Sequence, residues 1–127
     1  MIDLFITDAG KNQLLKFFHN PSCSKSRAVL ELLQNAQKEF CLVEYLKNPL
    51  EKEEIALLID LLDEPADKLV RKKEDLFLKM AISKKELTPS LVGNLIERHP
   101  ILMERPVVKT EQKALICRPP IKVFDLL

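Results

Sequence analysis

Cys23 is the residue of this chain that is best placed to do chemistry. It follows a short apolar run and a polar turn at residues 19–22. Directly after it, residues 28–33 carry apolar side chains at three- and four-residue spacing, which predicts a helix. A cysteine at a helix N-terminus meets unpaired backbone N–H groups and the positive end of the helix dipole, and both favour a thiolate. The pattern therefore predicts a nucleophile with a depressed pKa.

The neighbours of Cys23 favour the same interpretation. Lys25 and Arg27 add positive charge within one helical turn, and the hydroxyl of Ser24 or Ser26 can donate a hydrogen bond to the sulfur. A cysteine is often only a small buried hydrophobic residue. This polar, charged surrounding does not form a core position, so the reactive role is the stronger hypothesis.

Composition limits the alternatives. The chain has 127 residues, enough for one domain, and a net charge of +1, which gives no electrostatic reason to bind nucleic acid or an anionic membrane. No apolar window approaches the roughly 18 residues of a membrane span, and the N-terminus does not read as a signal peptide. Three cysteines do not form a disulfide framework, and two glycines cannot build a phosphate-binding loop. Two histidines and scattered cysteines offer no metal site. We expect a cytoplasmic monomer.

The elements that must position Cys23 follow from apolar patterning and turn signals. The predicted strands cover 14–19, 40–45, 106–108 and 114–117. The predicted helices cover 24–36, a segment opened by Asn48-Pro49 and ending near 62, 66–73, a segment capped by Thr88 and ending near 99, and 120–126, with a loop after 76–78. Strand, helix, strand implies a parallel pair with a right-handed crossover. We predict an α/β, thioredoxin-like fold. Its four-stranded mixed sheet carries a helical insertion at about 50–100, between the β-α-β and β-β-α halves.

Four motifs together resemble the glutaredoxin-dependent arsenate reductases, more closely the short-chain branch of that family. They are HNPSCSKSR at 19–27, LVRKKEDLF at 69–77, LMERPVV at 102–108 and RPP at 118–120. The resemblance covers residues 14–127 in order. Residues 1–13 precede it, and we treat them as an N-terminal extension of uncertain structure.

The resemblance implies a reaction and its residues. Cys23 would attack arsenate, and three arginines, Arg71, Arg105 and Arg118, would surround the oxyanion. Planar guanidinium groups suit this task because they bind tetrahedral anions with paired hydrogen bonds. No bound cofactor is expected. Glutathione would act as co-substrate, and glutaredoxin would resolve the mixed disulfide. Position 26 is serine, so no Cys-x-x-Cys pair exists and an external thiol is needed.

Other residues are predicted to support this site. His19 either orients the loop and favours the thiolate or is a hydrogen-bonded structural histidine, and Asn20 holds the loop backbone. Pro106 is predicted to follow a cis peptide bond, because thioredoxin-like folds keep a cis proline opposite the nucleophile. The bond would turn Arg105 toward Cys23.

The other two cysteines fall in apolar strand sequences. We therefore predict that Cys41 and Cys117 are buried and inert. Cys117 is the better candidate for an exception, because it adjoins Arg118.

Two other functions fit the same residues. Redox-sensing regulators of this fold bind RNA polymerase, but they use a Cys-x-x-Cys switch, and Ser26 occupies its second position here. A glutathione-linked thiol reductase with a substrate other than arsenate would use the same groups. Measuring arsenite production with glutathione and glutaredoxin present would reduce the uncertainty most, because it tests arsenate reduction directly.

Overall fold

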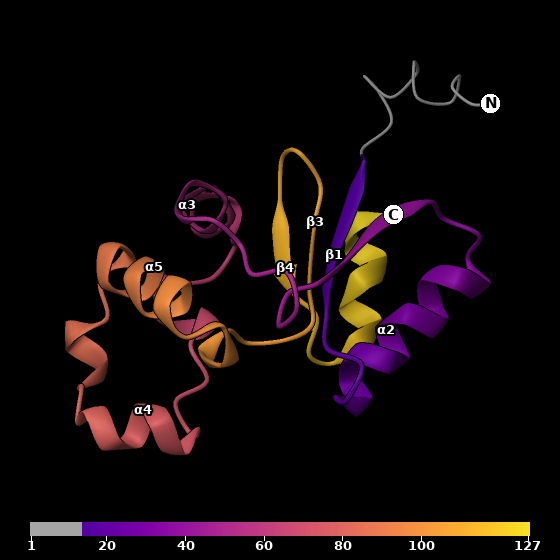
Figure 1. Ribbon diagram of the computed structural model, residues 1–127. Helices are drawn as coiled ribbons and strands as arrows, with labels where there is room; N and C mark the ends of the chain where they lie inside the picture. Colours follow the sequence, from indigo (N-terminus) through magenta and orange to yellow (C-terminus); the bar gives the residue numbers. More distant parts are fainter. Residues whose placement is uncertain (1–13) are drawn as a thin grey trace.

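The computed structural model describes residues 14–127, so the N-terminal extension at 1–13 lies outside the described residues. Its centre is a sheet with the strand order β2-β1-β3-β4 (Figure 1). The strands are β1 (Leu15–His19), β2 (Phe40–Glu44), β3 (Val107–Lys109) and β4 (Ala114–Ile116). β1 pairs with β2 in parallel and with β3 antiparallel, and β3 pairs antiparallel with β4. The predicted four-stranded mixed sheet is confirmed.

Because β1 and β2 are parallel, the segments that follow these two strands leave the sheet at the same end. Helix α2 (Ser24–Asn35) makes this crossover. In the parallel register His19 faces Glu44, so the two strands end level with each other. The loop that carries Cys23 and the residues that follow β2 therefore leave the sheet side by side.

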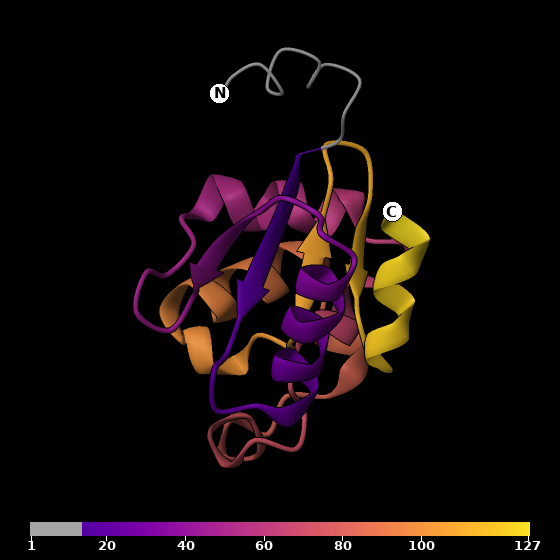
Figure 2. The same ribbon diagram turned by 90° about the vertical axis from the view of Figure 1, so that its right-hand side faces the viewer.

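Helices cover both faces of the sheet (Figures 1 and 2). Helix α2 and the 3-10 helix η5 (Pro120–Leu126) cover one face, and helices α3 (Lys52–Leu61) and α5 (Pro89–Arg98) cover the other. Neighbouring strand residues supply the two cores, because side chains alternate across a strand. Phe17 packs in the cluster under α2, and Phe18 packs in the larger cluster under α3 and α5.

The segment between β2 and β3 is helical, as predicted. Besides α3 and α5 it contains α4 (Asp75–Met80) and the 3-10 helices η2 (Ala66–Leu69), η3 (Lys84–Glu86) and η4 (Pro100–Leu102). The start of α5 follows the sequence prediction. The Thr88 hydroxyl accepts a hydrogen bond from the Leu91 N–H at 3.2 Å, and Pro89 occupies the first turn.

Two details of this segment differ from the prediction. A helix over 66–73 is wrong, because η2 ends at Leu69 and Val70 is extended. Val70 instead pairs with Met103 in an isolated antiparallel bridge. The Arg71 N–H donates to the Leu102 carbonyl at 2.8 Å, which extends this pairing. Residues 76–78, left without a predicted element, lie in α4, and the loop expected after them begins only beyond Met80. Backbone pairing with a distant segment thus overrides local helix propensity.

The ends of the C-terminal hairpin carry the two arginine–proline steps. Arg105–Pro106, just before β3, is a cis peptide bond, which confirms the prediction. Arg118–Pro119, just after β4, is also cis, and the sequence analysis did not predict it.

The two remaining cysteines differ. Cys117 is buried as predicted, but the prediction that Cys41 is buried is wrong, because its side chain is exposed. The reason is strand order: β2 is an edge strand of the sheet, so part of it is left uncovered. No helix among residues 14–127 is long and apolar enough to cross a membrane.

Candidate active site

Cys23 is the N-cap residue of α2, as its sequence position predicts. Its backbone N–H donates to the Asn20 carbonyl at 3.0 Å, and its own carbonyl accepts from the Arg27 N–H at 3.0 Å. The residue is 8% exposed, so its thiol is largely buried just below the protein surface. The loop and the first helical turn together fix where the sulfur points.

The surroundings of the sulfur favour the thiolate. Burial raises the pKa of Cys23, but this effect is outweighed. The backbone N–H groups of Ser26 and Lys25, at the start of α2, and the charges of Arg105 and Arg118 together bring the pKa of Cys23 below its usual value. The sequence analysis attributed the lowered pKa to the charges of Lys25 and Arg27. In the structure the positive charges that lower it belong to arginines of the C-terminal hairpin, and helix α2 contributes its backbone N–H groups.

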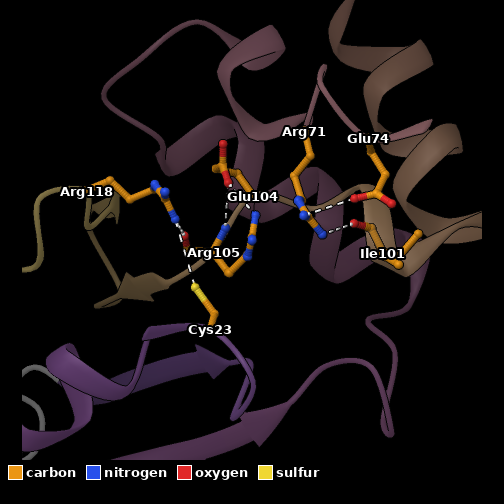
Figure 3. A network of polar contacts seen from close by, with 7 residues as sticks. All are labelled: Cys23, Arg71, Glu74, Ile101, Glu104, Arg105 and Arg118. Carbon is orange, nitrogen blue, oxygen red and sulfur yellow. Dashed lines mark hydrogen bonds and ion pairs between the residues drawn. The ribbon is translucent and has the colours of Figure 1, made fainter. Parts of the chain in front are cut away.

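Arg118 and Arg105 converge on Cys23 (Figure 3). The Arg118 Nη1 lies 4.0 Å from the Cys23 sulfur and also donates to the Arg105 carbonyl at 3.1 Å. The Arg105 Nη1 donates to Glu104 Oε1 at 3.2 Å, and its Nε is buried without a hydrogen-bond partner among the described residues. The hairpin thus supplies two cations on the side of the site that faces the nucleophile.

Arg71 lies farther from the sulfur (Figure 3). Its Nη1 donates to the Ile101 carbonyl at 3.1 Å, and its Nη2 lies 3.0 Å from Glu74 Oε2. The bridge between Val70 and Met103 fixes this segment beside the one that ends in Arg105. All three predicted arginines therefore line one cavity, but only two of them act on the sulfur.

That cavity has a volume of about 480 Å³. Its lining carries a majority of cations and only two carboxylates. The cations are Lys68, Arg71, Lys72, Lys73, Arg105 and Arg118, and the carboxylates are Glu74 and Glu104. An excess of positive charge in a hollow attracts and concentrates anions.

His19 holds the loop together through Ser26. The His19 Nδ1 and the Ser26 Oγ are 2.6 Å apart, and the same Oγ accepts from the Asn20 N–H at 3.0 Å. Burial is the main cause that lowers the pKa of His19, with Arg27 acting the same way and Glu44 opposing. In a neutral His19 the tautomer decides whether Nδ1 donates to the Ser26 hydroxyl or accepts from it. The side chains of His19 and Ser26 therefore orient the loop, and the Ser26 hydroxyl bonds to His19 and to the Asn20 N–H rather than to the sulfur as predicted.

The other predicted supporting residues also fix backbone. The Asn20 Oδ1 accepts from the Ser22 N–H at 2.9 Å, and the Arg27 Nη1 donates to the Pro21 carbonyl at 2.8 Å. The Pro106 carbonyl accepts from the Cys117 N–H at 2.9 Å, which ties the start of β3 to the end of β4.

Cys117 does not supply a second nucleophile. Burial raises the pKa of its thiol to about 12, so it is not ionised at neutral pH. No group of three or more potential metal ligands comes together among residues 14–127.

The sequence analysis missed three residues at the site. Glu74 and Glu104 were hidden in charged stretches, although the i, i+3 spacing of Arg71 and Glu74 was a visible signal for an ion pair. Tyr45 was counted only as a strand residue, and it lies directly after β2 at the edge where Cys23 is held.

A mixed sheet with flanking helices and a cysteine at the N-terminus of the first crossover helix defines a thioredoxin-like protein. Residues 18–125 match the ArsC family, and the chain belongs to this family. An arsenate reductase of Acidiphilium multivorum is 31% identical over 89% of this chain and 80% of that protein. The uncharacterized protein YfgD of Escherichia coli K12 is 36% identical over 89% of this chain and 96% of that protein.

The fold of the family is seen in a solved relative. The structure of an arsenate reductase from Vibrio cholerae superposes with a TM-score of 0.83 at 31% identity. The match covers 91% of this chain and 98% of that chain. The helical insertion and the hairpin are therefore parts of a shared architecture.

Proposed function

We propose that this protein reduces arsenate to arsenite with the Cys23 thiolate as nucleophile. One observation carries the proposal: a cysteine with a lowered pKa lies beside Arg105 and Arg118, and these two arginines also line a cationic cavity. Arsenate is a tetrahedral oxyanion, and guanidinium groups neutralise its charge as the sulfur approaches. Relatives named arsenate reductase, at about 30% identity, support the choice of oxyanion.

The reaction has three steps. The Cys23 thiolate forms a sulfur–arsenic bond, and an arsenate oxygen leaves as water after taking up protons from solvent. A glutathione thiolate then forms a disulfide with Cys23 while the sulfur–arsenic bond breaks. Its electron pair stays on arsenic, which becomes arsenite. Glutaredoxin finally exchanges its own thiol with the mixed disulfide and restores Cys23.

The chain's own thiols favour an external reductant. Position 26 is serine, and the Ser26 hydroxyl is committed to His19. Cys117 is buried with a raised pKa, and Cys41 lies on the edge strand β2. The 480 Å³ cavity is larger than one oxyanion needs, which leaves room for a small anionic thiol such as glutathione. A glutathione-dependent reaction also fits a cytoplasmic location, where thiols are kept reduced.

The test is arsenite formation from arsenate with glutathione and glutaredoxin. We expect turnover by the wild-type protein, none by Cys23→Ser, and little when glutaredoxin is omitted. A Cys41→Ser variant is the matched control, because it removes an exposed thiol away from the cavity. No arsenite above the Cys23→Ser background would refute the proposal.

A second candidate is a glutathione-linked thiol reductase whose substrate is a disulfide rather than arsenate. The observation in its favour is that Arg71 and Arg105 already hold carboxylate partners, Glu74 and Glu104, which compete with an oxyanion. A small glutathione mixed disulfide tested in the same assay separates the two functions. Reduction of the disulfide without any arsenite formation would favour this candidate.

A further inference from the structure

Tyr45 lies beside the nucleophile loop, although no motif points to it. It directly follows Glu44, the last residue of β2. Glu44 is level with His19 in the parallel register, so Tyr45 leaves the sheet next to Asn20, at the start of the loop that carries Cys23. The ring packs in the large core cluster under α3 and α5, and the residue is 1% exposed.

The hydroxyl of this buried ring has no hydrogen-bond partner among residues 14–127. The Asn20 side chain is close enough to lower the pKa of Tyr45, but it completes no hydrogen bond of normal length and angle. A buried hydroxyl without a partner costs stability. A tyrosine that served only packing could be a phenylalanine without this cost.

The groups around the hydroxyl belong to the site. Burial raises the pKa of Tyr45, the charges of Arg105 and Arg71 lower it, and the Cys23 sulfur raises it again. The net pKa is raised, so the hydroxyl keeps its proton at neutral pH. Arginine has no acceptor atom, and the Asn20 Oδ1, which accepts the Ser22 N–H, makes no hydrogen bond to the Tyr45 hydroxyl. The Tyr45 proton therefore has no acceptor among residues 14–127.

We propose that the Tyr45 hydroxyl donates a hydrogen bond to an oxygen of the tetrahedral oxyanion bound between Cys23 and Arg105. The inference rests on the proposed function for the identity of this ligand. The buried Arg105 Nε, which also has no partner among the described residues, provides a second N–H donor nearby. Tyr45 is thus a neutral donor in a site whose other side-chain donors are cations, and the protein leaves its hydroxyl free until the anion arrives.

The experiment compares anion affinity with intrinsic stability. Arsenate binding is measured by calorimetry on Cys23→Ser, which holds arsenate without reacting, and on Cys23→Ser/Tyr45→Phe. We expect Tyr45→Phe to weaken binding by about 10- to 100-fold, the usual range for a hydrogen bond to a charged group. Without arsenate, its Tm should be unchanged or higher, because the deleted hydroxyl had no partner.

The outcomes separate this inference from the proposed function. Equal arsenate affinity in the two proteins would overturn the role of Tyr45 and leave arsenate binding intact. No arsenate binding to Cys23→Ser would overturn the proposed function and this inference together. A clear fall in Tm on Tyr45→Phe without arsenate would assign the hydroxyl a structural role instead. Thr110→Val in the same background is a control, since the buried Thr110 hydroxyl holds only the β3–β4 turn.

Discussion

The candidate site has a nucleophile side, around Cys23, and an anion side, around the arginines, and the two are built on different principles. On the nucleophile side, His19, Ser26 and Asn20 satisfy one another's hydrogen bonds inside the protein. On the anion side, two arginines are paired with carboxylates at partly exposed positions, and polar atoms of Arg105 and Tyr45 have no partner within residues 14–127. A nucleophile needs a fixed direction of attack, whereas an anion site must exchange its own contacts for those of the ligand.

Removing the Cys23 thiol tests the nucleophile side and has the largest expected effect. Cys23→Ser should abolish arsenate reduction, because serine is far less ionised at neutral pH. The direction of the pKa shift of Cys23, which is downward, can be measured. Its thiolate persists to lower pH than that of a free cysteine, so alkylation should stay fast until the pH falls below this lowered pKa.

The titration needs a background without the exposed thiol of Cys41. In Cys41→Ser, one fast-reacting cysteine should remain and should disappear in the double variant with Cys23→Ser. Cys117 should react only on unfolding, because it is buried and its pKa is about 12. A Cys23 that titrates like a free cysteine would contradict the electrostatic account of the loop.

Substitution of the three arginines tests the anion side. Arg105→Ala and Arg118→Ala should each lower kcat/KM by roughly 10²–10³, the usual loss for a donor that stabilises developing charge. Arg71→Ala should lower it less, because Arg71 is held by Glu74 and the Ile101 carbonyl rather than by the sulfur. Melting temperatures should change little. Unchanged activity in all three variants would rule out an oxyanion site at this place.

Local sequence signals predicted the nucleophile side well. The apolar spacing after Cys23 placed the helix N-terminus, and Thr88-Pro89 placed the start of α5, because both depend on neighbouring residues only. Contacts between distant segments set the features that the sequence analysis missed. The pairing of Val70 with Met103 ended the predicted helix early, and the edge position of β2 exposed Cys41.

The anion side was harder to predict for the same reason. Three arginines were identified only through motifs, and their partners were not. The sequence does not say that the charges of Arg105 and Arg71 act on Tyr45, because this depends on the parallel register of β2 and the return of the hairpin.

A smaller effect is expected from breaking the hydrogen-bond network on the nucleophile side. Ser26→Ala removes the hydroxyl that serves both His19 and the Asn20 N–H, so two buried polar groups lose their partner. We expect a loss of about 1–3 kcal/mol in the free energy of unfolding and a several-fold slower alkylation of Cys23. Ser24→Ala, at an exposed position of the same turn, is the matched control. Equal stability of the two variants would show that the network does not hold the loop.

The smallest effect should come from the ion pair between Arg71 and Glu74. Their side chains are 21% and 23% exposed, and ion pairs of this kind stabilise by only about 0–1 kcal/mol. Glu74→Gln should therefore barely change the Tm, but it frees Arg71 for the ligand and removes a negative charge from the cavity. Arsenate binding to Cys23→Ser should tighten a few-fold, and more at low salt, since screening weakens exposed charges.

Glu64→Gln, which breaks the 3.5 Å pair with Lys122 away from the cavity lining, should leave affinity unchanged. Weaker binding in Glu74→Gln would show that Glu74 positions Arg71 for the anion rather than competing with it, and the anion side would then be as fixed as the nucleophile side.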